Sequence, residues 1–249
     1  MAIMIKTPQE IAKMRRSGEA LQKVLFAVRE VVAPGVSTMD LEKAAASKIA
    51  ELHATPAFKG YHGYPACLCT SVNDQVIHGI PSAKKILSEG DVVSVDCGVV
   101  LDGFYSDSAV TIPVGKVSQG VRKLLDVTQQ SLDAAIQEAQ VGATLGDIGA
   151  TVQEAVEANG FSVVRDFVGH GIGRSMHEDP QIPNYGTRGR GTKLRAGMVL
   201  AIEPMVNIGS GDVQVLPDGW TAVTVDGKWS AHFEHTVAVT ESGPVILTR

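Results

Sequence analysis

The sequence has few cysteines, no long hydrophobic run and no strong excess of charge. Its three cysteines, Cys67, Cys69 and Cys97, match no zinc-binding spacing and no disulfide framework, so a reducing, cytoplasmic setting is expected. The N-terminal apolar stretch ends at Lys6 and is too short for a secretory signal or a membrane span. A net charge of −5 argues against a membrane-surface protein or a dedicated nucleic-acid-binding protein.

No low-complexity segment or linker interrupts the 249 residues, which suffice for one large core. Thr7, Pro8 and Glu10 form a helix-start signal, with Thr7 as the cap and Pro8 at the first helical position. Apolar residues at helical spacing predict helices over 8–33, 38–52, 121–139 and 145–159. The basic residues of YGTRGRGTKLRAG are interpreted as a solvated Gly-rich loop.

Five ionisable residues lie in apolar, strand-like or Gly-rich segments, where charge is normally excluded. A single carboxylate in a strand usually pairs with arginine or caps a turn, but several unpaired ones would cost several kcal/mol each to bury without cations. They are Asp96 in DVVSVDCGVV, Asp107 in FYSDSAVTI, His170 in GHGIG, Glu203 in GMVLAIEPMV and Glu234 in AHFEHTVAV.

Four carboxylates and one imidazole can hold two divalent metal ions, because a carboxylate can bridge through its two oxygens. The four negative charges of the carboxylates balance the charge of two dications, so the site is neutral before a bridging hydroxide is added. Carboxylate-rich ligation with one imidazole favours Mn(II), Fe(II) or Co(II) over purely structural zinc. The sequence therefore predicts a two-metal hydrolase.

The chain also repeats itself with a constant offset of 107 positions. Residues 35–41 (GVSTMDL) align with 142–148 (GATLGDI), and 90–96 (GDVVSVD) align with 197–203 (GMVLAIE). Each half is expected to hold two helices followed by a hairpin with metal ligands, and Asp96 and Glu203 are equivalent positions. Glu234 lies later in the sequence than the offset from Asp107 predicts, because extra residues at roughly 209–230 precede it. We expect one catalytic domain over 1–249, with halves at about 7–115 and 117–249.

His170 is expected at the tip of a flexible loop, where flanking glycines let a side chain approach a metal closely. His177 follows in SMHEDP, and His78 lies in QVIHGIP of the first half. From the sequence alone, a surface or hydrogen-bonded role is the simpler interpretation of His78. Spacing does not rank the remaining histidines, which are His53, His62, His232 and His235.

These motifs together resemble those of the type I methionine aminopeptidases. The resemblance runs from roughly Thr7 to the C-terminus and implies the α/β pita-bread fold, in which two pseudo-symmetric halves with antiparallel sheet and outer helices surround a dinuclear metal site. It also implies removal of the initiator methionine from nascent proteins, by attack of a metal-bridging hydroxide on the first peptide bond. The motifs are Asp96-x10-Asp107, YHGYPACLCTSVNDQVIHGIP from Tyr61, GHGIGRSMHEDP from Gly169, AIEP from Ala201 and FEHTVAV from Phe233.

The resemblance assigns roles to the predicted ligands. Asp96 chelates one metal ion, Asp107 and Glu234 bridge both, and His170 and Glu203 complete the other. The expected ions are cobalt, manganese or iron(II), with zinc as a further candidate. Glu203 is also the implied proton shuttle from the bridging water to the leaving amine.

The resemblance further implies that His177 and His78 hydrogen-bond the substrate amide and stabilise the tetrahedral intermediate. Met176 stands where the family more often has an aromatic residue. A monovalent cation, Na⁺ or K⁺, is implied at the backbone carbonyls of Asn73, Gln75 and Ser230. The substrate pocket is expected from side chains whose sulfur atoms and aromatic edges suit a thioether, namely Phe58, Tyr61, Tyr64, Cys69, Met176 and Trp220, together with His78 and His177.

Two alternatives stay open. An Xaa-Pro aminopeptidase or dipeptidase shares the fold and the five ligands but usually carries a further N-terminal domain. A non-catalytic binding protein could keep the fold without the metals. Nothing before Pro8 resembles a zinc-binding or proline-rich ribosome-docking extension, and the 25 residues between His177 and Glu203 leave no room for the helical insert of type II enzymes. The expected protein is therefore a short, bacterial-style type I enzyme that is a monomer, acts on methionyl peptides and nascent chains, and works near the ribosome.

Overall fold

A computed structural model describes residues 3–249; residues 1 and 2, which belong to the N-terminal apolar stretch, lie outside the described part. The predicted helices are present, but the first one ends at Arg29 rather than near residue 33. Beyond it the chain tightens into i→i+3 turns at Val31 and Val32 before Pro34, which cannot continue a helix. The helices are α1 (Pro8–Arg29), α2 (Thr38–Glu51), α3 (Gln119–Gln137) and α4 (Leu145–Glu157), with a 3₁₀ turn η1 at Tyr61–Gly63.

The strands are β1 (Thr55–Pro56), β2 (Leu68–Val72), β3 (Gln75–Ile77), β4 (Val92–Leu101), β5 (Phe104–Pro113), β6 (Ser162–Val163), β7 (Gly169–Gly171), β8 (Glu178–Ile182), β9 (Val199–Ile202), β10 (Met205–Asn207), β11 (Val213–Val215), β12 (Ala222–Thr224), β13 (Ser230–His232), β14 (His235–Thr240) and β15 (Gly243–Ile246). All of their pairings are antiparallel. The first half is built on the long β4–β5 hairpin, with β1 and β2 on the other edge of β4. The second half is built on a five-stranded sheet in the order β15-β14-β9-β7-β8.

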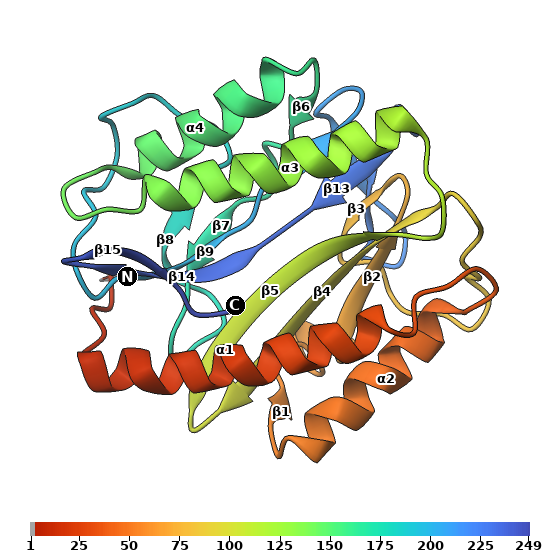
Figure 1. The fold of residues 1–249 in the computed structure, drawn as a ribbon, viewed down its shortest axis with the longest axis horizontal. Helices are drawn as coiled ribbons and strands as arrows, with labels where there is room; N and C mark the ends of the chain where they lie inside the picture. The colour runs from red at the N-terminus through yellow and green to blue at the C-terminus, as the bar shows by residue number, and fades with distance from the viewer. Residues whose placement is uncertain (1–2) are drawn as a thin grey trace.

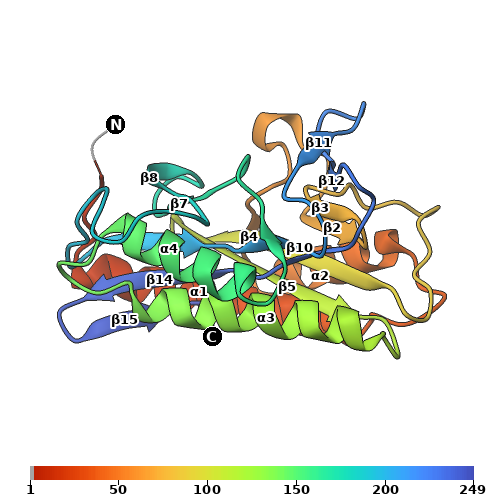
Figure 2. The same cartoon turned by 90° about the horizontal axis from the view of Figure 1, so that it is seen from above.

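Two helix pairs cover these sheets. Figure 1 shows α3 beside α4 at the top and α1 beside α2 at the bottom, with the strands running between the pairs. In Figure 2 the extra segment that holds β11 and β12 rises on the side opposite α1 and α3. Each pair buries its apolar face in a core of its own: Leu21 and Val24 of α1 pack in the first, and Leu124 and Ile148 of α3 and α4 in the second.

The 107-residue offset appears in the structure as equivalent elements. The helices α2 and α4 begin at this offset, and so do β4 and β9. Ser37 and Thr144, one offset apart, each donate their N–H and hydroxyl groups to the carboxylate three residues further on, Asp40 or Asp147. Such reciprocal caps satisfy backbone groups that a helix start leaves free, and each is worth about 1 kcal/mol. Both halves therefore start the helix before the ligand strand in the same way.

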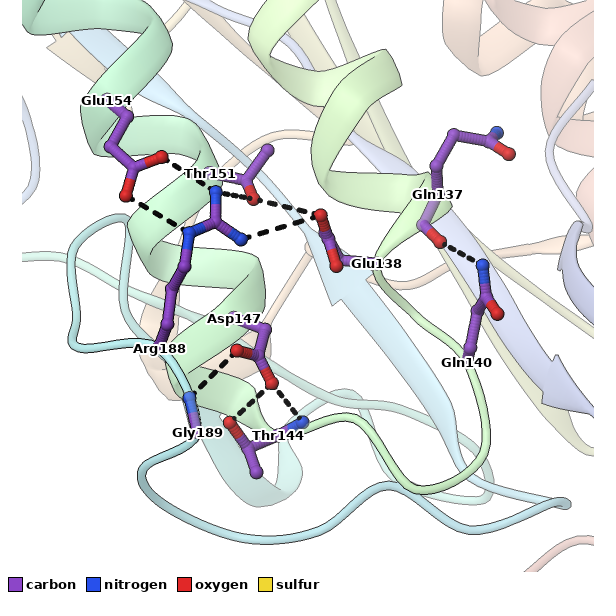
Figure 3. Close-up of polar contacts among 9 residues, drawn as sticks. All are labelled: Gln137, Glu138, Gln140, Thr144, Asp147, Thr151, Glu154, Arg188 and Gly189. Atoms are coloured by element: carbon purple, nitrogen blue, oxygen red, sulfur yellow. Dashed lines mark hydrogen bonds and ion pairs between the residues drawn. The ribbon is translucent and has the colours of Figure 1, made fainter.

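The basic Gly-rich loop is exposed, as predicted, but one of its arginines is anchored. Figure 3 shows Arg188 reaching the carboxylates of Glu154 and Glu138 and the hydroxyl of Thr151. The neighbouring Gly189 N–H donates to Asp147 at the start of α4. The loop is therefore fastened to the helix pair instead of being only solvated.

Hydrogen bonds across the middle of the molecule join the two halves. The hydroxyl of Thr236 donates to the Asp107 carbonyl and accepts the Asp107 N–H. The Glu234 N–H donates to the Ala109 carbonyl, and the Ser108 hydroxyl donates to the Glu234 carbonyl. Each buried bond contributes roughly 1 kcal/mol net, and together they fix β5 against the segment around Glu234. Among residues 3–249, no helix is long and apolar enough to cross a membrane.

Candidate metal centre and active-site cavity

The first half supplies two carboxylates from neighbouring strands. Asp96 lies in the middle of β4 and Asp107 in β5, in a register that pairs Asp96 with Ala109 and Gly98 with Asp107. Residues two apart on a strand share a face, so both carboxylates lie on one face of the hairpin, two rungs apart. Both are buried.

The second half supplies its carboxylates where two strands are interrupted. Glu203 lies between β9 and β10, and Glu234 lies between β13 and β14. On one side of the gap Ile202 pairs with His235, and on the other Met205 pairs with His232, so the register sets Glu203 across from Glu234. Breaks of this kind free side chains from the regular pleat and aim them at a common point.

His170 is not on a flexible loop, and that prediction is wrong. It lies in β7, which pairs with β8 on one side and β9 on the other. The flanking glycines serve close packing: a Cβ on Gly169 would lie 2.3 Å from the Ala201 carbonyl oxygen, and one on Gly171 would lie 2.3 Å from that of Asp179. The glycines thus let three strands close around a rigid imidazole.

The five predicted ligands converge. Ligand atoms of Asp107, His170 and Glu234 all lie within 4.8 Å of one another. The Nε2 atom of His170 is 3.9 Å from Asp107 Oδ2 and 3.7 Å from Glu203 Oε1. His170 Nδ1 contacts the Gly171 carbonyl oxygen at 2.8 Å and must be the protonated nitrogen, so Nε2 offers a free lone pair.

The electrostatics of this cluster fit bound cations. Burial raises the pKa of Asp96 to about 7 and that of Glu203 to about 8. Burial and then the neighbouring carboxylates raise the pKa values of Asp107 and Glu234 well above their usual range. One buried oxygen each of Asp96, Asp107 and Glu234 has no hydrogen-bond partner. Clustered carboxylates whose buried oxygens lack donors are the arrangement that divalent ions satisfy.

One cavity of about 460 Å³ brings the predicted metal-ligand, catalytic and substrate-pocket residues together. Both the metal-ligand candidates and the predicted pocket residues line it. His62, which spacing did not rank, also lines it; the only signal for it was its place between Tyr61 and Tyr64. The lining residues are Phe58, Tyr61, His62, Tyr64, Cys69, His78, Asp96, Asp107, His170, Met176, His177, Glu203, Trp220 and Glu234.

The apolar wall is built from rings and sulfur atoms in contact. The Tyr64 ring meets the Trp220 ring edge to face, with centroids 5.0 Å apart. The Tyr64 hydroxyl is turned away to the carbonyls of Leu68 and Gly79. Burial raises the pKa of the Cys69 thiol well above its usual value, so the thiol stays protonated and acts as an apolar group. This wall can accept an unbranched, polarisable side chain.

Gly98 makes room for Met176 in that wall. A Cβ on Gly98 would lie 2.8 Å from Phe58 Cε1 and 3.1 Å from the Met176 methyl carbon. The same strand therefore supplies Asp96 to the cluster and, two residues later, space for the wall.

The two predicted catalytic histidines have different neighbours in the cavity lining. His177 Nδ1 is 2.7 Å from the Tyr61 hydroxyl, and its ring centroid is 4.2 Å from that of His170. His78 adopts a left-handed conformation, φ 60°, and meets the rings of Phe167 and Trp220 edge to face. Burial lowers the pKa of His78 to about 4 and also lowers that of His177, so both imidazoles are neutral at pH 7.

His232 is the site residue that sequence reasoning missed. Its Nε2 atom is 3.4 Å from Glu203 Oε2, although it does not line the cavity. Strand alternation with Glu234 was the available signal, since residues two apart share a face.

The segments expected to bind a monovalent cation also meet. The Ser230 N–H donates to the carbonyl oxygen of Asn73, and Gln75 pairs with Val223 of β12 in the extra segment. Asn73 adopts a left-handed backbone conformation, φ 58°, which turns this connection sharply.

The fold and the cluster define a metallopeptidase, and the chain belongs to metallopeptidase family M24, whose model matches residues 12–241. Methionine aminopeptidase from Clostridium perfringens is 55% identical over 99% of this chain and 98% of its own length. Methionine aminopeptidase from Escherichia coli is 46% identical over 100% of this chain and 94% of its own length. Within family M24, the chain therefore belongs to the methionine aminopeptidases.

Comparison with solved structures agrees with the family assignment. The crystal structure of methionine aminopeptidase from Thermotoga maritima covers 100% of both chains with a TM-score of 0.98 and 52% identity. The prolidase from Pyrococcus horikoshii covers 98% of this chain and 63% of its own, with a TM-score of 0.79 and 22% identity. At this low identity, the similarity to the prolidase concerns the fold alone. It shows that both chains share the pita-bread architecture expected from the sequence.

Proposed function

We propose that the protein removes the N-terminal methionine from peptides and nascent chains by metal-assisted hydrolysis of the first peptide bond. The observation that carries the proposal is that two features meet in one cavity. The first is a cluster of three buried carboxylates, the nearly buried Glu203 and one imidazole, and the second is a wall of aromatic and sulfur side chains. The first suits hydrolysis, and the second suits a thioether side chain.

Two divalent ions are proposed at the cluster. Asp96 would hold one, His170 and Glu203 the other, and Asp107 and Glu234 would bridge them. Mn(II), Fe(II) and Co(II) are the favoured ions because the donors are mostly hard oxygens with one imidazole, and zinc is a further candidate. When bound, such ions acidify water and polarise a carbonyl oxygen.

Glu203 is proposed to carry a proton from the attacking water to the leaving amine. Burial raises its pKa to about 8, so its carboxyl group can hold a proton near neutral pH. Its Oε1 lies 3.7 Å from His170 Nε2, so it stands beside the cluster, and it lines the cavity.

His177 and His78 are proposed to hold the substrate. The Tyr61 hydroxyl occupies His177 Nδ1, which leaves Nε2 for the substrate amide. His78 is neutral for the reason given above, and a neutral imidazole can donate one hydrogen bond to an oxygen that gains charge. Both residues line the cavity with the cluster.

Cleavage of two peptides separates this proposal from an Xaa-Pro peptidase. Met-Ala-Ser should be cleaved well and Ala-Pro-Ala poorly, because the wall offers contacts to a thioether rather than to a proline ring at the second position. Preference for Ala-Pro-Ala would overturn the assignment. A non-catalytic binding protein would cleave neither peptide and would show no stimulation by Mn(II) or Co(II).

Further properties belong to the same proposal. The chain is proposed to act as a cytoplasmic monomer with a single catalytic domain, on chains that emerge from the ribosome. A monovalent cation, Na⁺ or K⁺, is proposed near Asn73, Gln75 and Ser230, where the extra segment meets the first half. Ion-dependent protection of residues 73–75 and 230 from hydrogen exchange would test that site.

A further inference from the structure

His232 is a buried imidazole with no hydrogen-bond partner on either ring nitrogen. Its side chain is 2% exposed, and both Nδ1 and Nε2 are fully enclosed. Leaving a buried polar atom without a partner costs about 1–3 kcal/mol, so a ring in this position calls for a local function.

The backbone fixes where this ring lies. The His232 N–H donates to the Thr111 hydroxyl, which in turn donates to the His232 carbonyl. His232 also pairs with Met205 in the β10–β13 ladder, one rung from the interruption that holds Glu203 and Glu234. The backbone of His232 is thus held by β5 and β10, and this fixes the point from which the buried ring projects.

The ring lies beside one oxygen of Glu203, and His170 lies beside the other. Glu203 Oε2 is 3.4 Å from His232 Nε2, and Glu203 Oε1 is 3.7 Å from His170 Nε2. The carboxylate therefore stands between two imidazoles, and each oxygen has a different neighbour. Among the described residues, the group whose ligand atoms lie mutually within 4.8 Å is Asp107, His170 and Glu234, and it does not include His232.

We infer that His232 is a positioning residue: its Nε2, 3.4 Å from Glu203 Oε2 and without another partner, would donate its hydrogen to that oxygen after a small closure of the gap and would thereby hold Glu203 Oε1 toward the metal cluster and the substrate. This inference rests on the proposed role of Glu203 as the proton carrier. Without the donor, the Glu203 side chain regains rotamer freedom, and its productive orientation becomes one of several.

Three variants test the inference. His232→Leu fills the space but removes the donor, His232→Asn keeps an amide that is too short to reach Glu203, and His232→Gln places an amide N–H near the position of Nε2. In the Mn(II)-loaded protein, kcat for Met-Ala-Ser should fall about 10- to 100-fold in the Leu and Asn variants and recover most of the loss in Gln. KM should stay within about twofold of wild type in all three, because the substrate pocket is untouched.

Metal affinity is the readout that separates positioning from ligation. Calorimetric titration with Mn(II) and the visible absorption of the Co(II) form should match wild type in all three variants. Weakened Mn(II) binding with a changed Co(II) spectrum would make His232 a metal ligand and overturn the inference. Wild-type kcat in both His232→Leu and His232→Asn would overturn it as well. Wild-type protein that releases no methionine with any metal would instead defeat the proposed function, and the role of His232 with it. If the Leu variant does not fold, the kcat values of the Asn and Gln variants decide the question: a lower kcat in Asn than in Gln supports the inference, and equal values overturn it.

Discussion

Lys6 Nζ lies 2.6 Å from Glu178 Oε2 in an ion pair whose side chains are 6% and 10% exposed. The other oxygen of Glu178 accepts the N–H groups of Arg174 and Ser175. The pair thus ties the N-terminal arm to the turn that leads into Met176 and His177, so the shape of the cavity depends on a residue far away in the sequence.

Replacing Lys6 with methionine should destabilise the protein by about 3 kcal/mol, because Glu178 would be left buried without its cation. The free energy of unfolding in urea measures the effect. Lys43→Met is the matched control, since the Lys43–Asp40 pair is exposed and its loss should cost less than about 1 kcal/mol. The double variant Lys6→Met/Glu178→Gln should lose less than the sum of the two single variants. Equal stability of Lys6→Met and Lys43→Met would contradict the account.

Glu203→Gln should lower kcat by about 10²–10⁴-fold, the range for a positioned acid–base group. The amide keeps an oxygen but can no longer take up a proton. Single-turnover release of methionine, with Mn(II) binding measured in parallel, separates loss of proton transfer from loss of metal. Wild-type turnover in this variant would remove Glu203 from the proton pathway.

Trp220→Ala should raise KM for methionyl peptides roughly tenfold or more, because it removes one face of the apolar wall. The chain offers its other tryptophan as the control: Trp229 packs against the second-half core and does not line the cavity. Trp229→Ala should therefore lower the melting temperature and leave KM unchanged. Similar KM values for both variants would take Trp220 out of the substrate pocket.

Metal removal should destabilise the protein more at pH 8.5 than at pH 7. Burial raises the pKa of Asp96 to about 7 and that of Glu203 to about 8, so the folded, metal-stripped protein holds protons that the unfolded chain has already lost. A group that binds more protons when folded loses stability as pH rises through its folded pKa. Buried His170 and His78, with pKa values lowered to about 3 and about 4, are neutral in the folded protein throughout this range. The small slope that comes from their titration in the unfolded chain is common to the loaded and the stripped protein, so it cancels in the comparison.

Melting temperatures with Mn(II) and with EDTA at the two pH values provide the test. The difference between the loaded and the stripped protein should widen at pH 8.5, because bound cations stabilise the ionised carboxylates. A difference that is the same or smaller at pH 8.5 would mean that the cluster is already ionised without metal.

Local patterns predicted the elements well. Helix starts depend on neighbours three residues away, so the cap at Thr7 and Glu10 and the helical spacing that follows located α1. The repeat likewise predicted the equivalence of β4 and β9. The presence of unpaired carboxylates in apolar, strand-like segments of the sequence singled out Asp96, Asp107, Glu203 and Glu234 as ligand candidates for a physical reason, since such groups are too costly to bury alone.

Contacts between distant segments were not predictable in this way. The glycines beside His170 suggested a flexible loop from the sequence. In the structure they instead allow three strands to approach closely. The Lys6–Glu178 pair joins positions 172 residues apart, and no local pattern marks either partner. The contact between His232 and Glu203 can be recognised only from the structure, because it depends on the strand register that places the two residues next to each other.

Release of free methionine from Met-Ala-Ser by metal-stripped protein, titrated with Mn(II), Fe(II) and Co(II), tests the central claim most directly. Asp107→Asn should abolish release, because Asp107 belongs to the tightest ligand group, and Asp102→Asn on the exposed turn of the same hairpin should leave it unchanged. We expect no release without metal and restored release with at least one of the three ions. Release that persists after metal removal, or that survives in Asp107→Asn, would contradict it.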